Sequence, residues 1–216
     1  ELRYLEISDR ISISGGIIEL PSLDSLYNLE KLVLKNTKIQ NLPPLNPLKK
    51  LKSISIINDH STPLSLSFLP NWDSLKHLES IQIRNVDLLE LPELDSLKKL
   101  LILSVHGSNI SMLPSPNLPE KLTELTIELS RLNTLPEINN LKNLEKLSLR
   151  VNNLQSLPYL NGLKDLSYLD VSTNHLSQFP SIDSLIALEY FDCSDNNLTV
   201  FPNLNSGPHL QDLFIR

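Results

Sequence analysis

Leucine and other apolar residues recur along the chain at fixed intervals, with polar positions between them. In the copy that opens at Leu144 the pattern reads L-x-x-L-x-L-x-x-N-x-L-x-x-L-P and ends at Pro158. The alternation of Leu147 and Leu149 has the period of a short strand with one buried face. The pattern therefore predicts one short strand in each copy, with its apolar side chains on one side.

The prolines set the length of the repeat. Pro21 and Pro43 are 22 residues apart, and after one gap of 27 residues the 22-residue interval continues from Pro70 to Pro202. A single copy cannot bury its own apolar side chains, so the copies must stack on one another. The leucines that open the copies are Leu2, Leu29, Leu51, Leu78, Leu100, Leu122, Leu144, Leu166, Leu188 and Leu210.

These positions predict an α/β-type solenoid in which about ten parallel strands form one curved sheet with a concave outer face. The segments that return to the next strand contain Leu-Pro, as at Leu157 and Pro158. Proline fixes φ and has no N–H to donate. We therefore expect extended or short 3₁₀ structure on the convex side rather than α-helices.

The asparagine position of the pattern is filled unevenly. Asn152, Asn174 and Asn196 occupy it in the seventh to ninth copies, where a side-chain amide can satisfy backbone groups of the turn. The earlier copies carry Arg10, Thr37, Asp59, Val86, Ser108 and Ser130 there. We expect the amino-terminal half to be the softer one for this reason.

Two copies are longer than the rest, by five residues each. The extra residues fall in segments 9–18 and 58–68, which lie two copies apart and should emerge on the same side of the solenoid. Tolerated loop variation explains such segments, and so does a protruding contact loop on a rigid scaffold. Both interpretations stay open at this point.

The chain opens inside a repeat at Leu2 and stops at Arg216, inside the tenth strand. A solenoid needs polar caps to cover its core and its open strand edges. We therefore expect residues 1–216 to be a single uncapped repeat domain, and a fragment of a longer chain.

Composition excludes several classes of protein. One cysteine among 216 residues rules out a disulfide framework and a cysteine-based zinc site, and five glycines argue against a Gly-rich phosphate loop. A net charge of −6 argues against a nucleic-acid binder, and no apolar run is long enough to span a membrane. The five histidines form no ligand cluster. We expect no catalytic residue, no metal and no cofactor.

Two conspicuous residues fall on core positions. Cys193 holds the inward position that Leu149 and Val171 hold in the preceding copies, which predicts a buried and unreactive thiol. Trp72 holds the position of Leu45 in an earlier copy. We interpret both as scaffold residues.

The outward strand positions near the carboxyl end gather aromatic and acidic side chains. Tyr168 and Tyr190 hold one position in neighbouring copies, and Asp170 and Asp192 hold the next. Neighbouring strands are about 4.8 Å apart, so each pair should lie side by side. Adjacent like charges are destabilising, and a basic partner would relieve that repulsion.

We therefore expect this outer face to bind a partner protein with a basic surface, and a solvated sheet without a partner is the alternative. The tenth copy continues the face with Asp212, Phe214 and Arg216. The expected partner-binding residues are Tyr168, Asp170, Tyr190, Asp192, Asp195 and Phe214. The oligomeric state is not determined by these patterns.

A row of lysines precedes the strands on one flank. Its members are Lys49, Lys76, Lys98, Lys142 and Lys164. Solubility and protection against sheet association explain such a row, and an anionic partner is the other interpretation.

The repeat resembles the leucine-rich repeat family over the whole chain. The Leu-Pro at the close of each copy, and the stretch from Leu113 to Leu122 with three prolines, resemble the Leu-Pro-rich subtype of bacterial effectors of the YopM/IpaH kind. A 22-residue repeat is also typical of internalins and of a phosphatase-regulating repeat subunit.

The resemblance implies a bacterial effector that acts as a non-catalytic protein-interaction module in virulence. It would be cytoplasmic, or secreted into the host cytoplasm. The alternatives are a phosphatase-regulating repeat subunit, or the substrate-recognition arm of a ubiquitin ligase whose catalytic domain lies outside these residues. Some such ligases use a Cys-x-Asp motif, but Cys193 and Asp195 match it only at a core position.

Overall fold

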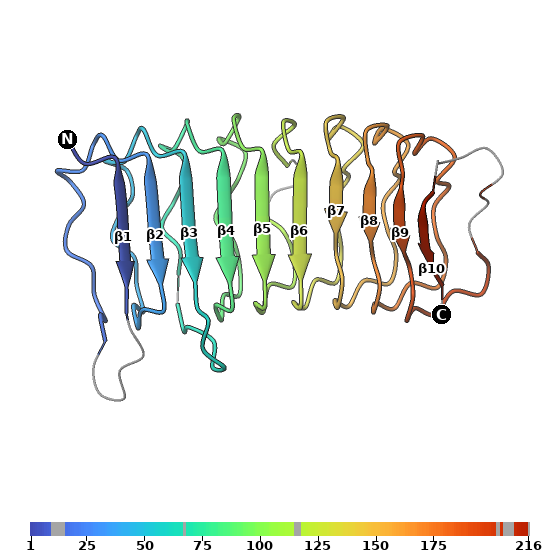
Figure 1. Ribbon diagram of the computed structural model, residues 1–216, viewed down its shortest axis with the longest axis horizontal. Coiled ribbons are helices and arrows are strands. Elements are labelled where there is room, and N and C mark those ends of the chain that lie inside the picture. The colour runs from blue at the N-terminus through green and yellow to red at the C-terminus, as the bar shows by residue number, and fades with distance from the viewer. Residues whose placement is uncertain (10–15, 67, 115–117, 202–203, 205–209, 216) are drawn as a thin grey trace.

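The computed structural model describes residues 1–9, 16–66, 68–114, 118–201, 204 and 210–215. It contains one sheet of ten parallel strands in chain order (Figure 1). The strands are β1 (Tyr4–Ser8), β2 (Lys31–Lys35), β3 (Ser53–Ile57), β4 (Ser80–Arg84), β5 (Ile102–His106), β6 (Glu124–Glu128), β7 (Lys146–Ser148), β8 (Tyr168–Asp170), β9 (Tyr190–Asp192) and β10 (Asp212–Phe214). The predicted solenoid of ten strands is therefore confirmed.

Strand register follows the repeat. Leu147 of β7 lies opposite Leu169 of β8, and Leu169 lies opposite Phe191 of β9. All three side chains are fully buried. A slip of one residue would move each of them to the outer face, so the apolar alternation holds the register.

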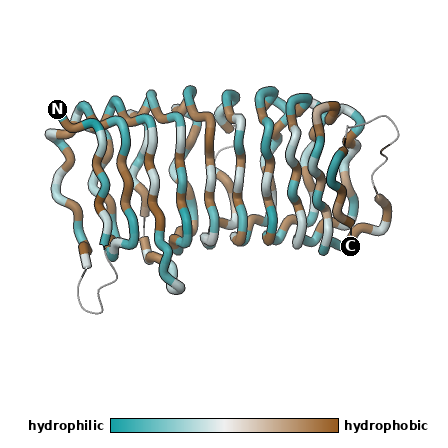
Figure 2. Tube along the Cα trace, viewed as in Figure 1, coloured by the Kyte–Doolittle hydropathy of each residue, from teal (hydrophilic) through white to brown (hydrophobic). Residues whose placement is uncertain are grey.

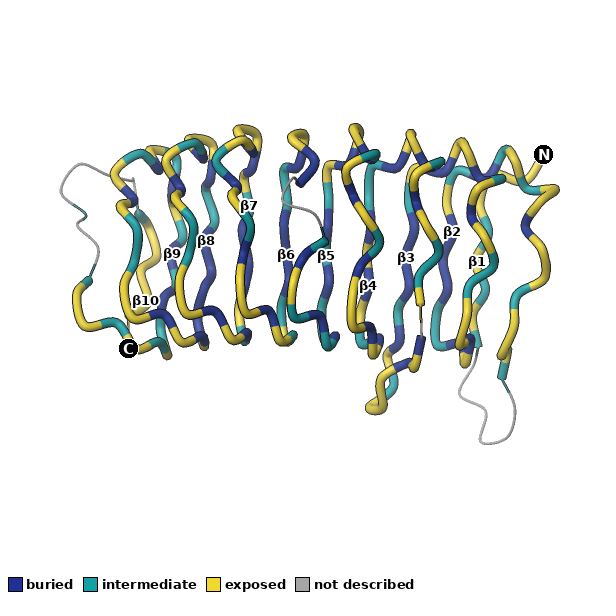
Figure 3. The backbone as a smooth tube through the Cα atoms, turned by 180° about the vertical axis from the view of Figure 1, so that it is seen from behind, coloured by how far each residue is buried: buried dark blue, intermediate teal, exposed yellow. Residues whose placement is uncertain are grey.

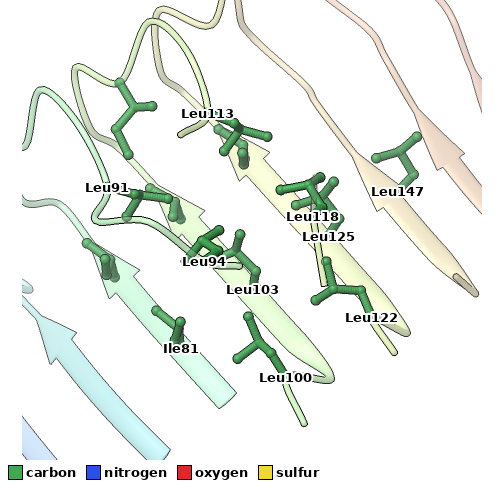
Figure 4. Close-up of a cluster of buried hydrophobic side chains, with 14 of the residues drawn as sticks. Ile81, Leu91, Leu94, Leu100, Leu103, Leu113, Leu118, Leu122, Leu125 and Leu147 are labelled. Carbon is green, nitrogen blue, oxygen red and sulfur yellow. The ribbon is translucent and has the colours of Figure 1, made fainter. Parts of the chain in front are cut away.

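The core is a continuous apolar column between the sheet and the return segments. Figure 4 shows the middle of it, where Leu100 and Leu122 at the starts of two copies pack beside Leu103 and Leu125 of β5 and β6. The tube in Figure 2 alternates between apolar and polar along each coil, and Figure 3 shows, from behind, buried segments along the coils from β2 to β9. Trp72 and Cys193 are both buried in this column, as expected.

The return segments contain turns instead of helices. In the copy that contains Pro158, the N–H of Leu163 donates to the carbonyl of Leu160 at 3.0 Å, and that of Leu166 donates to Leu163 at 3.2 Å. The described residues contain no helix of any kind. The expectation of extended structure without α-helices is confirmed, and the 3₁₀ character is limited to single turns.

The three asparagines form a hydrogen-bonded ladder inside the stack. The Asn152 amide nitrogen donates to the carbonyls of Ile127 and Leu149 at 2.7 and 2.9 Å, and its oxygen accepts the Leu132 N–H at 2.9 Å. Asn174 and Asn196 make the same contacts in the next two copies. One side chain thus satisfies backbone groups of its own copy and of the preceding one.

In earlier copies the side chain at the ladder position makes fewer hydrogen bonds to the backbone of the turn. The hydroxyls of Thr37 and Ser108 stand at the ladder position and are buried without a hydrogen-bond partner. Val86 is fully buried, and the preceding residue, Asn85, donates to the carbonyl of His60 in its place. Arg10 lies outside the described residues. The greater softness of this half stays a prediction.

In the longer third copy, β3 is followed by a loop, residues 58–64, that extends past the carboxyl ends of the neighbouring strands (Figure 1). Three asparagine side chains hold it. Asn58 donates to the carbonyl of Thr62 at 2.6 Å, Asn85 donates to that of His60, and Asn36 accepts the Asp59 N–H at 2.7 Å.

Both insertions rejoin the stack at the same position of the repeat. The carbonyl of Ile17 accepts the N–H of Lys38 at 2.9 Å, and that of Leu64 accepts the N–H of Asp87 at 2.8 Å. Residues 10–15 of the first insertion and residue 67 of the second lie outside the described part of the chain.

Candidate protein-binding surface

Alternate residues of each strand point away from the core and together form the outer face of the sheet. On β8 and β9 these residues are Tyr168 and Tyr190 in one row and Asp170 and Asp192 in the next, and both pairs are register partners. On β10, Phe214 continues the row of Asp192. Regular stacking of the copies places these sequence-predicted residues side by side. Arg216, the other predicted member of this face, lies outside the described residues.

The aromatic side chains form a continuous stack across three strands. The rings of Tyr168 and Tyr190 are parallel within 4°, with centroids 4.3 Å apart, and Phe214 lies 5.5 Å from Tyr190 at an interplanar angle of 43°. Burial raises the pKa of both tyrosine hydroxyls, the Asp170 carboxylate raises both further, and Asp192 also raises that of Tyr190. The rings therefore stay neutral and offer large, rigid contact surfaces.

The two aspartates each close the end of their strand. The Oδ1 atom of Asp170 accepts the N–H of Ser172 at 3.0 Å and its hydroxyl at 2.6 Å. Asp192 makes the same pair of contacts with Ser194. Burial raises the pKa of Asp170, with Asp192 and Glu128 adding to the effect and the bonds from Ser172 opposing it.

Their accessibility differs. Asp170 is only 4% exposed, whereas Asp192 is half-buried. A partner would therefore meet Asp192 directly and would sense Asp170 through its charge. Asp195 is exposed but lies in the turn after β9, where its φ is 54°, and so stands at the margin of the two rows.

A hollow of about 500 Å³ adjoins the aromatic stack across β5 to β8. The sequence pattern did not predict it. Its lining includes Ile102, Glu124, Glu128, Lys146 and Tyr168. The sequence signal was present, because all five residues hold outward strand positions. Their proximity becomes visible only once the side chains are placed.

Lys146 lies between an acid and an aromatic ring in this hollow. Its Nζ is 3.2 Å from Glu124 Oε1 and 5.7 Å from the centroid of Tyr168. Glu128 accepts a hydrogen bond from the Ser148 hydroxyl at 2.5 Å. The outer face next to the stack is thus suited to an ammonium or guanidinium group.

The thiol of Cys193, which could in principle react, belongs to the buried scaffold. Burial raises the pKa of the Cys193 thiol to about 11, which leaves it protonated at neutral pH. Among the described residues no group of three acidic, histidine or cysteine side chains could hold a metal ion. The described part of the chain also has no helix of the length and apolarity that a membrane crossing requires. The predicted lysine row is exposed throughout.

Comparison with known families and structures supports the repeat assignment. Residues 142–184 match the family model described as leucine-rich repeats, two copies. Comparison with curated proteins finds no match.

Several solved structures share the fold. A leucine-rich repeat protein of Leptospira interrogans is 26% identical, with a TM-score of 0.68 over 93% of this chain and 65% of that one. YopM from Yersinia enterocolitica is 28% identical, with a TM-score of 0.64 over 98% and 46%. The repeat domain of the type III effector XopL is 22% identical, with a TM-score of 0.66 over 98% and 76%, a likeness of fold.

The repeat pattern and the ten-strand solenoid are those of the leucine-rich repeat fold, and residues 142–184 match that family's model. The structural relatives of this chain include the effector YopM, as the Leu-Pro-rich pattern predicted. The chain spans less than two thirds of the length of the Leptospira and YopM structures. Solenoids of stacked repeats present an extended surface, and the outer face described above is the extended surface of this chain.

Proposed function

We propose that this chain is a non-catalytic protein-interaction module that binds a partner protein through the carboxy-terminal part of its outer face. The contact residues are the aromatic stack of Tyr168, Tyr190 and Phe214 together with Asp192, with Asp170 and Asp195 contributing charge. The stack is the observation that carries this proposal, because three adjoining aromatic rings on an open sheet face are typical of interface anchors.

The charges around the stack favour a partner with a basic surface. Burial raises the pKa of Asp170, with Asp192 and Glu128 adding to the effect, so the free protein bears a repulsion that a lysine or arginine would reduce. Lys146 already occupies such a position between Glu124 and Tyr168. A cation from a partner would find the same two kinds of contact.

The similarity to YopM and to the type III effector XopL supports a role for this chain as a bacterial effector, acting in virulence after secretion into the host cytoplasm. Under this proposal the partner is a host protein. A capture experiment with host-cell lysate would identify it, and the binding constants of variants would then test the surface.

Replacement of Tyr190 by alanine is the decisive variant. Loss of a central aromatic anchor commonly costs about 2 kcal/mol or more, so the dissociation constant should rise roughly 30-fold. Tyr159→Ala is the matched control, because Tyr159 is 67% exposed and lies outside every strand of the sheet. A partner whose affinity survives Tyr190→Ala and Phe214→Ala, and depends on the loop 58–64 instead, would refute this surface.

A further inference from the structure

The outer face reverses its charge along the stack. Between β2 and β5 its outward positions carry the cations Lys31, Lys35 and Arg84 and no carboxylate. Between β6 and β10 they carry one cation, Lys146, and five carboxylates, on Glu124, Glu128, Asp170, Asp192 and Asp212. The half that the proposed function leaves unused is thus opposite in sign to the half that it uses.

The three cations border an area of the outer face that includes two serine side chains. β3 lies between β2 and β4, so the backbones that carry Lys35 and Arg84 are roughly 10 Å apart. In the row of Lys31 the next two residues are Ser53 and Ser80, both half-buried. Serine hydroxyls can donate to a carboxylate, so this surface offers hydrogen bonds as well as positive charge.

The carboxylate of Asp59 shows how the charges of this area act on an acidic group. The Nζ of Lys35 is 3.1 Å from Asp59 Oδ2. The hydrogen bond from Lys35 lowers the pKa of Asp59, and the charges of Arg84 and His60 lower it further. Asp170, at the other end of the face, has its pKa raised. Burial is the main cause at Asp170, but the charges of Asp192 and Glu128 also raise its pKa, whereas the charges around Asp59 lower that of Asp59.

The loop 58–64 has a fixed backbone, which places Asp59 beside this area. The side chains of Asn36, Asn58 and Asn85 bind its backbone, so Asp59 stands at a defined place beside Lys35. Arg84 is exposed, and within the described residues its guanidinium has neither a hydrogen bond nor an ion pair. It is the group of the three that is most available to an external carboxylate.

We propose that the area formed by Lys31, Lys35 and Arg84 binds an acidic segment of the same partner whose basic segment binds at the aromatic stack. This inference rests on the proposed function for the basic end. From β3 to β9 there are six strand spacings, or roughly 29 Å. An extended chain covers that span in about nine residues. The charge reversal determines the orientation of the partner, with its acidic segment over β2 to β4 and its basic segment at the aromatic stack.

Three fluorescein-labelled peptides test the inference by fluorescence anisotropy at low salt. They are hexaglutamate, hexalysine, and a diblock in which three glutamates and three lysines are separated by six Gly-Ser residues. The double variant Lys31→Gln/Arg84→Gln should weaken hexaglutamate binding at least tenfold. The matched control is Lys98→Gln/Lys164→Gln, which removes the same charge from the exposed lysine row and should have a much smaller effect.

The acidic half has its own variant, Asp192→Asn/Asp212→Asn, which should weaken hexalysine at least tenfold and spare hexaglutamate. The diblock should bind tighter than either single-charge peptide, because linked contacts raise the effective concentration of the second one. Circular dichroism melting would verify that each variant is folded.

The two proposals fail in different ways. If hexaglutamate binds the Lys31→Gln/Arg84→Gln variant as well as the control, the acidic-segment site is wrong and the proposed function stands. If hexalysine binding is absent or unaffected by Asp192→Asn/Asp212→Asn, the basic partner is wrong, and the bipolar partner is overturned with it.

Discussion

At the scale of single residues, the outer-face aspartates combine a structural and an electrostatic role. Asp170 accepts two hydrogen bonds from Ser172 and is almost fully buried beside Asp192. An asparagine oxygen can accept the same two hydrogen bonds without carrying a charge. The charge of this carboxylate therefore lowers the stability of the free protein, although its hydrogen bonds from Ser172 order the end of the strand.

Asp170→Asn should raise the melting temperature at pH 7. A folded-state pKa above the unfolded value means that the native state binds the extra proton, so stability falls as pH rises from about 4 through the raised pKa. The variant should flatten that part of the stability–pH profile, measured by urea unfolding between pH 4 and pH 7. A lower stability of the variant at pH 7 would contradict this account.

Among the glycines that the structure describes, Gly162 has the least room for a side chain. A Cβ there would lie 1.9 Å from the carbonyl oxygen of Asn139, which is backbone and cannot rotate away. Gly162→Ala should therefore destabilise the stack by about 2–3 kcal/mol, as overpacking does. Gly107→Ala is the control, because its Cβ would meet Asn85 only at 3.5 Å and the cost arises from its φ of +69°, about 1 kcal/mol. Equal losses in the two variants would argue against the clash.

At the scale of elements, the asparagine ladder couples each turn to the turn before it. Asn152→Ala would leave the buried carbonyl of Ile127 and the N–H of Leu132 without this partner, and would remove one of the two amide donors to the carbonyl of Leu149. Each unsatisfied buried group costs about 1–3 kcal/mol, so we expect a loss of at least ~2 kcal/mol in the free energy of unfolding.

Ser108→Ala provides the contrast, since its hydroxyl stands at the same position and has no hydrogen-bond partner. Its removal should cost well under 1 kcal/mol. Hydrogen exchange of the flanking amides would show whether the Asn152 defect spreads only to neighbouring copies, as expected of a one-dimensional stack. An equal loss of stability in both variants would show that the amide ladder is not the cause.

At the scale of the whole molecule, the outer face acts as a long surface with two charged ends. Binding through exposed charges is screened within about 10 Å at 0.1 M salt. Partner affinity should therefore fall as salt rises from 0.05 to 0.5 M, and the Asp192→Asn variant should show a shallower salt dependence. An affinity independent of salt, with Tyr190 still required, would indicate an interface carried by the aromatic stack alone.

Most of the architecture follows from the chain's own periodicity. Leu147, Leu169 and Phe191 share a register because each copy can bury its apolar residues only against the next one, so spacing in sequence becomes spacing along the stack. The same logic places Tyr168 beside Tyr190 and buries Cys193. These features needed no knowledge of side-chain conformation.

Tertiary structure alone decided how side chains from different copies combine. Long side chains choose among rotamers according to their neighbours, so spacing could not show that Lys146 lies between Glu124 and Tyr168. Nor could it show that Asp170 is buried, or that Asn58 and Asn85 hold the long loop over the strand ends. The repeat determined the backbone because its packing is local and periodic, whereas the burial and contacts of the outer-face side chains depend on which neighbours each one meets across copies.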